Sequence, residues 1–341
     1  MIIFIGGSMN RTSIIYSILI VALLTTIGFS FYFYQQVQIN NQKVADSIDS
    51  ETSLPAYHFA LIGEEMNHDY WRLVGEGAKK SESEFDVMVE YEGPKRSNPE
   101  EQLKLFDMAI KSKVDGIIVQ ALNESFTPLI NQAVNEGIPV ITIDTDSSGS
   151  LRDAYIGTDN YLAGQLAGKA LVEDTGGKAA VGIITGSFDN AHHMQRVQGF
   201  KDVVEPFEGI EIVAIEESNI TRVDTEEKAY EMLTKYENIT AFYGTSSYNG
   251  MGIAAAAKSL KRKDDMYVIT FDRIDENLQL LEKGEIDAIV EQQPFEMGYR
   301  SVKTMIDLLE NRPVQEVYHT DVSILRSSDL TVEKSQRGRD S

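Results

Sequence analysis

The chain has 341 residues, a length that predicts about two domains of ordinary size rather than one core. Its 53 acidic residues outnumber 31 basic ones and give a formal net charge of −22, which repels phosphate backbones and argues against a nucleic-acid partner. No cysteine is present, which excludes disulfides, thiolate metal sites, a cysteine nucleophile and a cysteine-linked lipid anchor.

An uncharged apolar stretch at residues 14–34 is long enough to cross a bilayer as a helix. Arg11 precedes it and an aromatic cluster at 31–34 ends it, as is typical of a membrane interface. We therefore expect a cytoplasmic N-terminus at 1–13, a single-pass membrane anchor, and the rest of the chain on the extracellular or periplasmic side. A cleaved signal peptide is the alternative, but its apolar region would be shorter and followed by small residues.

Polar segments without apolar periodicity follow the anchor and close the chain. Residues 35–55 end at Pro55 and are predicted to form a flexible tether. Residues 331–341 are predicted to form a polar tail.

Between these segments, short apolar runs alternate with segments of helical periodicity, a pattern typical of repeated βαβ units. The sequence therefore predicts an α/β fold with two doubly wound parallel-sheet lobes. The predicted strands are 57–63, 87–91, 114–120, 138–144, 154–157, 180–185, 210–216, 239–243, 266–271, 288–291, 318–319 and 322–325. The predicted helices are 70–84, 99–111, 125–136, 160–173, 194–204, 225–236, 250–260, 274–283 and 295–309.

Two such halves are compatible with a two-lobed binding protein or with an enzyme that has a cofactor half and a substrate half. The sequence contains no dinucleotide-binding glycine motif after a strand, no Walker loop, no nucleophile elbow and no H-E-x-x-H. We therefore expect neither enzymatic activity nor a cofactor. His192 and His193 form the only histidine cluster, and we expect a surface or pocket pair rather than a zinc site.

Ligands of open α/β sheets bind at the carboxyl ends of the strands, so residues after each strand are candidates. The first strand is followed by His68, Tyr70 and Trp71, the only tryptophan. An aromatic plane beside hydrogen-bonding groups suits a sugar, which has an apolar face and a rim of hydroxyls. The alternative is that Tyr70 and Trp71 are core residues of the first helix.

Asp144 and Asp272 end equivalent strands in the two halves, where a carboxylate can accept hydrogen bonds from neighbouring sugar hydroxyls. Each aspartate could instead cap the next helix. Gln292 lies where the chain should cross between lobes. Arg196, near the start of a helix, could contact ligand or brace that helix.

A series of motifs in this order resembles the ribose- and galactose-type periplasmic sugar-binding proteins over residues 56–325: VDGIIVQ, EGIPVITIDTD, IGTDNYLAGQLAGKAL, RVQGF, MYVITFD and GEIDAIVEQQPFEMG. The resemblance implies two lobes joined by a three-strand hinge and closing on a small ligand. It assigns 56–158 with 293–320 to one lobe, and 159–292 with 321–330 to the other.

Several residues match the family's ligand positions. His68 stands where the family often has Asn or Asp, and Tyr70 or Trp71 matches its stacking aromatic. Asp144, Asp272 and Gln292 match its polar contacts directly. Other positions depart from the family. Thr145 stands where pentose binders often have Arg, and Met194 or Arg196 stands where they have an Arg that contacts the ligand. Ile220 stands where an aromatic residue is common, and Ser246 stands where Asn or Asp is usual. These departures leave open which sugar binds, and whether the ligand is a sugar.

Lactose-repressor-type regulators share the fold implied by this resemblance, but here a membrane segment stands in place of their DNA-reading motif. Two functions remain. The chain could be a membrane-anchored extracellular sugar receptor that signals to a membrane partner such as a two-component histidine kinase. It could instead be the substrate-binding component of a sugar ABC transporter, with a permease as its partner. The predicted anchor and the lack of cysteine favour the receptor.

Overall fold

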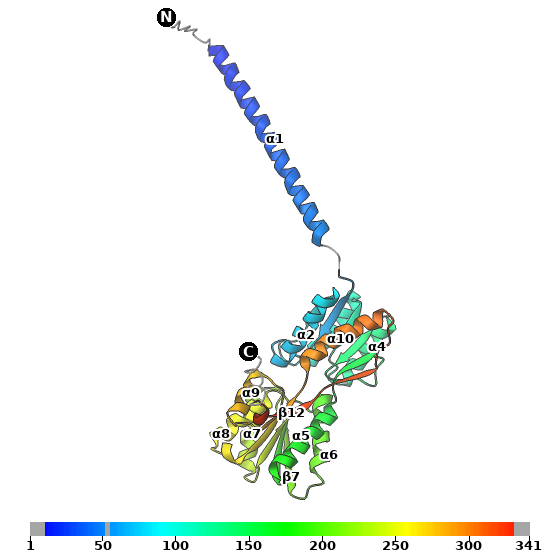
Figure 1. The fold of residues 1–341 in the computed structure, drawn as a ribbon, viewed down its shortest axis with the longest axis vertical. Coiled ribbons are helices and arrows are strands. Elements are labelled where there is room, and N and C mark those ends of the chain that lie inside the picture. The colour runs from blue at the N-terminus through cyan, green and yellow to red at the C-terminus, as the bar shows by residue number, and fades with distance from the viewer. Residues whose placement is uncertain (1–10, 52–54, 331–341) are drawn as a thin grey trace. The chain divides into compact units, whose positions relative to one another are not determined.

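The computed structural model describes residues 11–51 and 55–330. Residues 1–10 of the predicted cytoplasmic segment and the predicted polar tail at 331–341 lie outside the described residues. The chain divides into two compact units, Met1–Leu54 and Pro55–Ser341, which we describe separately (Figure 1).

The described part of the first unit is one helix, α1 (Arg11–Glu51). Its window Leu19–Ile39 is long and apolar enough to cross a membrane, by length and composition, and none of that window is buried within the structure. The prediction of a flexible tether at 35–55 is wrong up to Glu51, because the helix continues that far. Residues 35–51 contain neither glycine nor proline, so nothing in the backbone chemistry ends the helix before that point.

Within the described residues, the second unit contains two six-stranded sheets. The first has the order β11-β5-β4-β3-β1-β2, with all neighbours parallel. We call the part of the chain built on this sheet the N-lobe. Its strands are β1 (His58–Ile62), β2 (Met88–Glu92), β3 (Gly116–Val119), β4 (Val140–Ile143), β5 (Ala154–Thr158) and β11 (Val317–Thr320).

The second sheet, on which the C-lobe is built, has the order β12-β10-β9-β8-β6-β7. It departs from the predicted parallel arrangement at one edge, where β12 pairs antiparallel with β10. Its strands are β6 (Ala179–Thr185), β7 (Ile210–Glu217), β8 (Ala241–Gly244), β9 (Tyr267–Phe271), β10 (Ala288–Glu291) and β12 (Ser323–Arg326).

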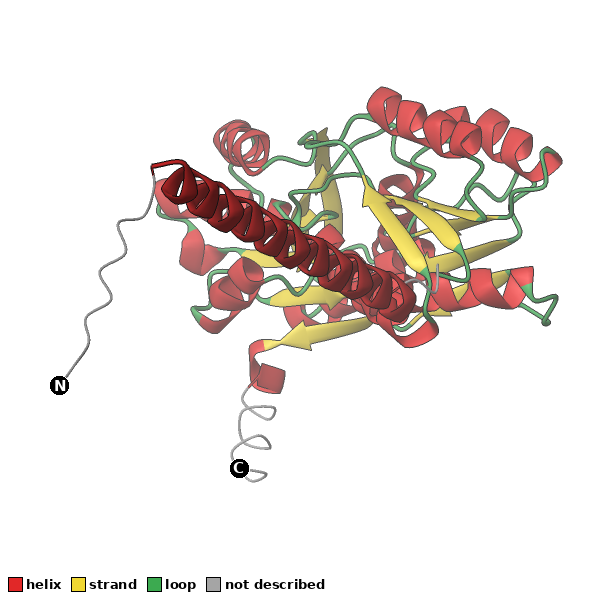
Figure 2. Ribbon diagram, turned by 90° about the horizontal axis from the view of Figure 1, so that it is seen from above, coloured by secondary structure: helices red, strands yellow, loops and turns green. Residues whose placement is uncertain are grey.

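Helices cover both faces of each sheet, as the ribbon shows (Figure 2). This is why central strands such as β3 are apolar and buried along their whole length. The N-lobe helices are α2 (Asp69–Phe85), α3 (Pro99–Ser112), α4 (Thr127–Asn135) and α10 (Pro294–Leu309), with the 3₁₀ turn η1 (Glu124–Phe126). The C-lobe helices are α5 (Asn160–Thr175), α6 (Ala191–Val204), α7 (Arg222–Lys235), α8 (Asn249–Ser259) and α9 (Asp275–Glu282), with η2 (Lys263–Asp265).

The chain passes between the two sheets three times: from β5 to α5, from β10 to α10, and from β11 to β12. All predicted strands are present, with ends that differ by at most two residues. Two helices begin three residues earlier in the structure than predicted. For α7 the cause is an N-cap, since the Thr221 hydroxyl accepts from the Asp224 backbone N–H. The other, α6, follows Asn190, whose side chain makes no capping hydrogen bond.

Candidate ligand site between the lobes

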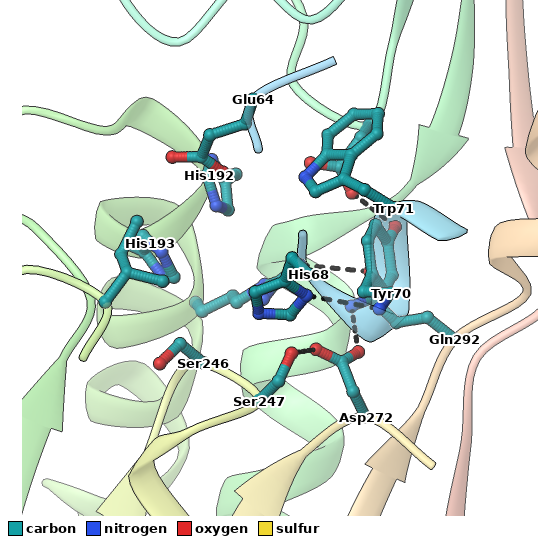
Figure 3. Close-up of a pocket in the computed structure, with 13 residues that line it drawn as sticks. Glu64, His68, Tyr70, Trp71, His192, His193, Ser246, Ser247, Asp272 and Gln292 are labelled. Atoms are coloured by element: carbon teal, nitrogen blue, oxygen red, sulfur yellow. Dashed lines mark hydrogen bonds between the residues drawn. The ribbon is translucent and has the colours of Figure 1, made fainter. Parts of the chain in front are cut away.

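The carboxyl ends of both sheets face a shared cavity. The space between the lining atoms is about 350 Å³, including solvent at its mouth, and about 40 Å³ of it can hold the centre of a water molecule. Figure 3 shows side chains from both lobes pointing toward it. The lining residues are Glu64, His68, Tyr70, Trp71, Asp144, His192, His193, Arg196, Ile220, Ser246, Ser247, Asp272 and Gln292.

Asp144 and Asp272 hold equivalent places, each directly after a strand and each with a left-handed backbone, at φ 62° and φ 72°. Such a conformation is uncommon for residues other than glycine and persists where the surroundings hold it. Neither aspartate caps a helix, so the capping alternative is wrong. The side-chain amide of Asn160 binds the Asp144 carbonyl, and the amide of Asn277 binds the Asp272 carbonyl.

Neutral donors hold the two carboxylates. The Tyr70 hydroxyl donates to Asp144 Oδ1 at 2.5 Å, and Gln120 Nε2 donates to Asp144 Oδ2 at 2.8 Å. Gln292 Nε2 donates to Asp272 Oδ1 at 2.6 Å, and the Ser247 hydroxyl donates to Asp272 Oδ2. Burial raises the pKa of both aspartates, an effect that the positive charge of Arg196 partly offsets. Each lobe therefore presents one oriented acceptor to the cavity.

The aromatic side chains of α2 form one wall. Tyr70 and Trp71 are both buried in the N-lobe core, as the core alternative predicted, and both also line the cavity. Their rings meet edge to face at 5.7 Å between centroids. His68 Nδ1 accepts a hydrogen bond from the Tyr70 backbone N–H, which makes this histidine the N-cap that begins α2. Burial lowers the pKa of His68 to about 4, so the ring is neutral.

Arg196 is held by neutral acceptors. Its guanidinium donates to Asn160 Oδ1 at 2.8 Å, to the Thr245 carbonyl at 2.9 Å and to Gln292 Oε1 at 3.0 Å. It also lies 4.0 Å from the centroid of the Phe271 ring. Arg196 therefore braces the C-lobe, as one of the two alternatives predicted, and it also lines the cavity.

Close helix packing fixes the position of Arg196. A Cβ at Gly164 of α5 would overlap the backbone carbonyl of Arg196 on α6. Only glycine permits that approach at Gly164, so α5 and α6 pack closely at the residue that carries the guanidinium.

Gln292 connects the cavity to the crossovers between lobes. Its Oε1 accepts from the Thr158 hydroxyl at 2.7 Å as well as from Arg196. Thr158 ends β5 and Gln292 follows β10, so one amide joins two of the three connections.

The first turn of α6 makes direct contacts between the lobes. The Ala191 backbone N–H donates to the Leu122 carbonyl at 3.0 Å. Thr145 Oγ1 and His192 Nδ1 lie 2.8 Å apart. The amide Nδ2 of Asn190 donates to Glu64 Oε1 at 3.1 Å. These three contacts hold the C-lobe against the N-lobe beside the cavity.

Eight of the nine predicted site residues line the cavity, and Thr145 is the exception. Its hydroxyl accepts from Gln120 Nε2 and contacts His192 instead. The ligand role predicted for Thr145 therefore has no support from its position. Five lining residues were not among the nine predicted site residues: Glu64, His192, His193, Ile220 and Ser247. Of these, Ile220 had been named as a departure at a family ligand position, and the histidine pair had been predicted to lie at the surface or in a pocket.

Four of these five residues lie close after the carboxyl end of a strand, a position that could have identified them from the sequence. Glu64 follows β1 closely, and Ser247 adjoins the predicted Ser246 after β8. The histidine pair begins the helix after β6, and burial lowers the pKa of both rings well below the usual value. Among residues 11–51 and 55–330, no group of three or more metal-binding side chains is placed to hold an ion.

Residues 59–313 match a family model described as a periplasmic binding protein domain. The chain belongs to this family. The chain is similar to the D-allose-binding periplasmic protein of Escherichia coli K12. The two sequences are 23% identical over 268 residues, which cover 76% of this chain and 86% of that protein.

Solved structures support the same assignment. The chain is similar to GanP, a glucose-galactose binding protein from Geobacillus stearothermophilus, with 50% identity and a TM-score of 0.79, over 81% of this chain and 99% of GanP. It is also similar to a chain of the XylFII-LytSN complex, with 35% identity and a TM-score of 0.77, over 80% of this chain and 98% of that one. The family and the two-lobed fold expected from the sequence motifs are thus confirmed.

Proposed function

We propose that this periplasmic binding protein is a membrane-anchored receptor that closes on an uncharged monosaccharide outside the cell. The observation that carries the proposal is a cavity bounded by one oriented carboxylate from each lobe, with Tyr70 and Trp71 beside it. Carboxylates accept hydrogen bonds from sugar hydroxyls, and an aromatic wall covers the C–H face of the ring.

The proposed mechanism is a shift between two states. A sugar that contacts Asp144 and Asp272 at the same time bridges the lobes, so it stabilises the closed state over a separated one. The cavity holds three carboxyl groups and one arginine, which makes phosphorylated sugars poor candidates. The half-identical neighbour GanP directs the first choice of probe to D-glucose and D-galactose.

We infer that the closed receptor signals to a membrane protein such as a two-component histidine kinase. The apolar window Leu19–Ile39 and the absence of cysteine support a helical anchor, and the anchor would keep the lobes near such a partner. The neighbour XylFII, solved together with LytSN, supports a protein partner for chains of this kind.

Delivery of the sugar to an ABC permease is the second candidate function. It is favoured by similarity to a sugar-binding protein of a sugar ABC transporter from Bacillus halodurans, with 27% identity and a TM-score of 0.73. The two roles predict different defects in a strain lacking this chain. A receptor predicts loss of sugar-induced transcription with uptake of labelled sugar still possible through an expressed permease. A transport component predicts loss of uptake itself.

The first test of binding is a thermal-shift screen of the full chain in detergent against pentoses, hexoses, hexose phosphates and disaccharides. A ligand that binds only the folded form raises the melting temperature once its concentration exceeds its Kd. We expect a shift with one or a few monosaccharides and none with the phosphates. A folded protein that responds to none of these sugars would refute the proposed ligand class.

A further inference from the structure

Glu64 is a buried carboxyl at the junction of the two lobes. Its side chain belongs to the loop after β1 in the N-lobe, and the residue is 6% exposed. Oε1 accepts one hydrogen bond from the Ser97 hydroxyl of the same lobe at 2.7 Å, and another from Asn190 Nδ2 of the C-lobe at 3.1 Å. One of the two hydrogen bonds to this buried carboxyl therefore comes from the opposite lobe.

No cation compensates the charge that this carboxyl would carry. Within the described ranges, no cation is among the groups that act on the Glu64 carboxyl. The one arginine on the cavity wall, Arg196, donates its hydrogen bonds to Asn160, Thr245 and Gln292. Asp144, a second carboxyl, lies close enough to oppose ionisation of Glu64. Burial also raises the pKa of the adjacent Glu65, but this residue is only half-buried, and the charge of Arg96 and a hydrogen bond with the Ser97 backbone partly offset the effect.

The histidines around the cavity do not supply a positive charge either. Burial lowers the pKa of His68 to about 4 and lowers the pKa of His192 and His193 well below their ordinary value. All three rings are therefore neutral near pH 7. A buried carboxylate surrounded by neutral donors and another carboxyl is costly, and such a group takes up a proton instead.

Burial is the largest effect on the Glu64 carboxyl. The side chains of Ser97, Asn190 and Gln120 form hydrogen bonds that favour its ionised form, but together they do not offset burial and the nearby charge of Asp144. The balance therefore favours the protonated acid when the lobes are closed.

We propose that closure of the lobes on a sugar takes up one proton from solvent onto the Glu64 carboxylate, so that sugar affinity increases as the pH falls. The inference rests on the proposed function, since it concerns regulation of the same cavity. Separation of the lobes removes Asn190 from Glu64 and admits water, which restores ordinary ionisation. Closure removes that water, and burial raises the pKa of Glu64 to about 7.

The sign and size of the effect follow from linkage. Below pH 7 the closed state retains its proton while the separated state has lost it, so protons favour closure between the ordinary pKa of glutamate and pH 7. Above pH 7 both states are ionised and the dependence levels off. We expect the Kd to be about tenfold lower at pH 6 than at pH 8.

Isothermal titration of the full chain in detergent with D-galactose and D-glucose, at pH 6, 7 and 8, tests the proposal. At pH 6.5, titrations in buffers of different ionisation enthalpy should show uptake of about 0.8 proton per sugar bound. In Glu64→Gln, which mimics the neutral acid, we expect no proton uptake and tight binding at all three pH values. The matched control Glu65→Gln should keep the pH dependence of the wild type.

The outcomes separate this inference from the function beneath it. Sugar binding by the wild type without proton uptake would overturn the inference and leave the receptor intact. An unchanged pH dependence in Glu64→Gln would also overturn it, by assigning the proton to another group. Binding of neither sugar at any pH would refute both the proposed ligand and the inference. A wild-type count of zero protons overturns the inference even if the Glu64 variant does not fold.

Discussion

Thr145 of the N-lobe and His192 of the C-lobe share a hydrogen bond, with Oγ1 and Nδ1 2.8 Å apart. Both side chains are buried. Burial lowers the pKa of His192 well below its usual value, so its ring is neutral. The bond exists only when the lobes meet. It therefore contributes to the closed state without contacting the ligand, a role different from the one that the sequence predicted for Thr145.

Thr145→Val should weaken sugar binding, because the closed state would then bury His192 Nδ1 without a partner. The expected loss is about 1 kcal/mol, or several-fold in Kd, by isothermal titration with D-galactose. The control is Thr127→Val, which removes a comparable contact to Ser147 within the N-lobe. Equal affinity of Thr145→Val and wild type would show that this bond does not contribute to closure.

Asp272→Ala should weaken binding by about 1 to 3 kcal/mol, because sugar hydroxyls lose a charged acceptor and Gln292 loses its partner. Calorimetry with the sugar found by the thermal-shift screen gives the measurement. Asp275→Asn, on the exposed first turn of α9, should bind as the wild type does. If Asp272→Ala also matched the wild type, the site would not include this carboxylate.

Arg196→Lys should fold but bind sugar at least tenfold more weakly. A guanidinium donates in a planar fork to Asn160, Thr245 and Gln292, and an ammonium cannot reach all three in that geometry. We expect the change in Kd together with a small change in melting temperature. Lys201→Arg, also on α6 but paired with Glu205, provides the control. Undiminished affinity in Arg196→Lys would mean that charge alone is required.

Trp71 should report sugar binding directly, since it is the only tryptophan and it lines the cavity. Titration with D-glucose or D-galactose should change the intensity or wavelength of its emission, with a midpoint equal to the calorimetric Kd. Trp71→Phe should lose the signal. Binding detected by heat with no change in the emission would place the ligand elsewhere.

Acid should destabilise the protein through His68. Burial lowers the pKa of His68 in the folded chain to about 4, from an ordinary value of 6.5. Between these pH values His68 is therefore protonated in the unfolded chain and neutral in the folded chain. Stability from this group is present above pH 6.5 and is lost as the pH falls toward 4. Between pH 7 and pH 5, His68 should lower the free energy of unfolding by about 2 kcal/mol.

His68→Asn should remove that share, because asparagine also caps helices and does not titrate. Urea unfolding of the full chain in detergent, followed by Trp71 emission at pH 7 and pH 5, measures the difference. His319→Asn, at an exposed position, should keep the wild-type pH dependence. A wild-type pH dependence in His68→Asn would mean that this histidine is neutral in both states or charged in both.

The cavity could be predicted in part because parallel strands bring their carboxyl ends to one edge. Asp144 and Asp272 lie directly after such ends, so their positions in the chain placed them at the cavity. His192 and Glu64 were not assigned because their roles depend on the opposite lobe. The tether was mispredicted for another reason: polar composition does not oppose a helix when glycine and proline are absent.

The sequence by itself determined the two α/β lobes, the apolar N-terminal stretch and most residues of the cavity wall. Alternating apolar runs specify local structure, and strand ends specify where a ligand can bind. Only the tertiary structure decided which side chains meet across the lobes, as Glu64 meets Asn190 and Thr145 meets His192. Glu64 and Asn190 are 126 positions apart in the sequence, and Thr145 and His192 are 47 positions apart. No local sequence pattern predicts such contacts, because the burial and charge at this junction arise only when distant segments pack together.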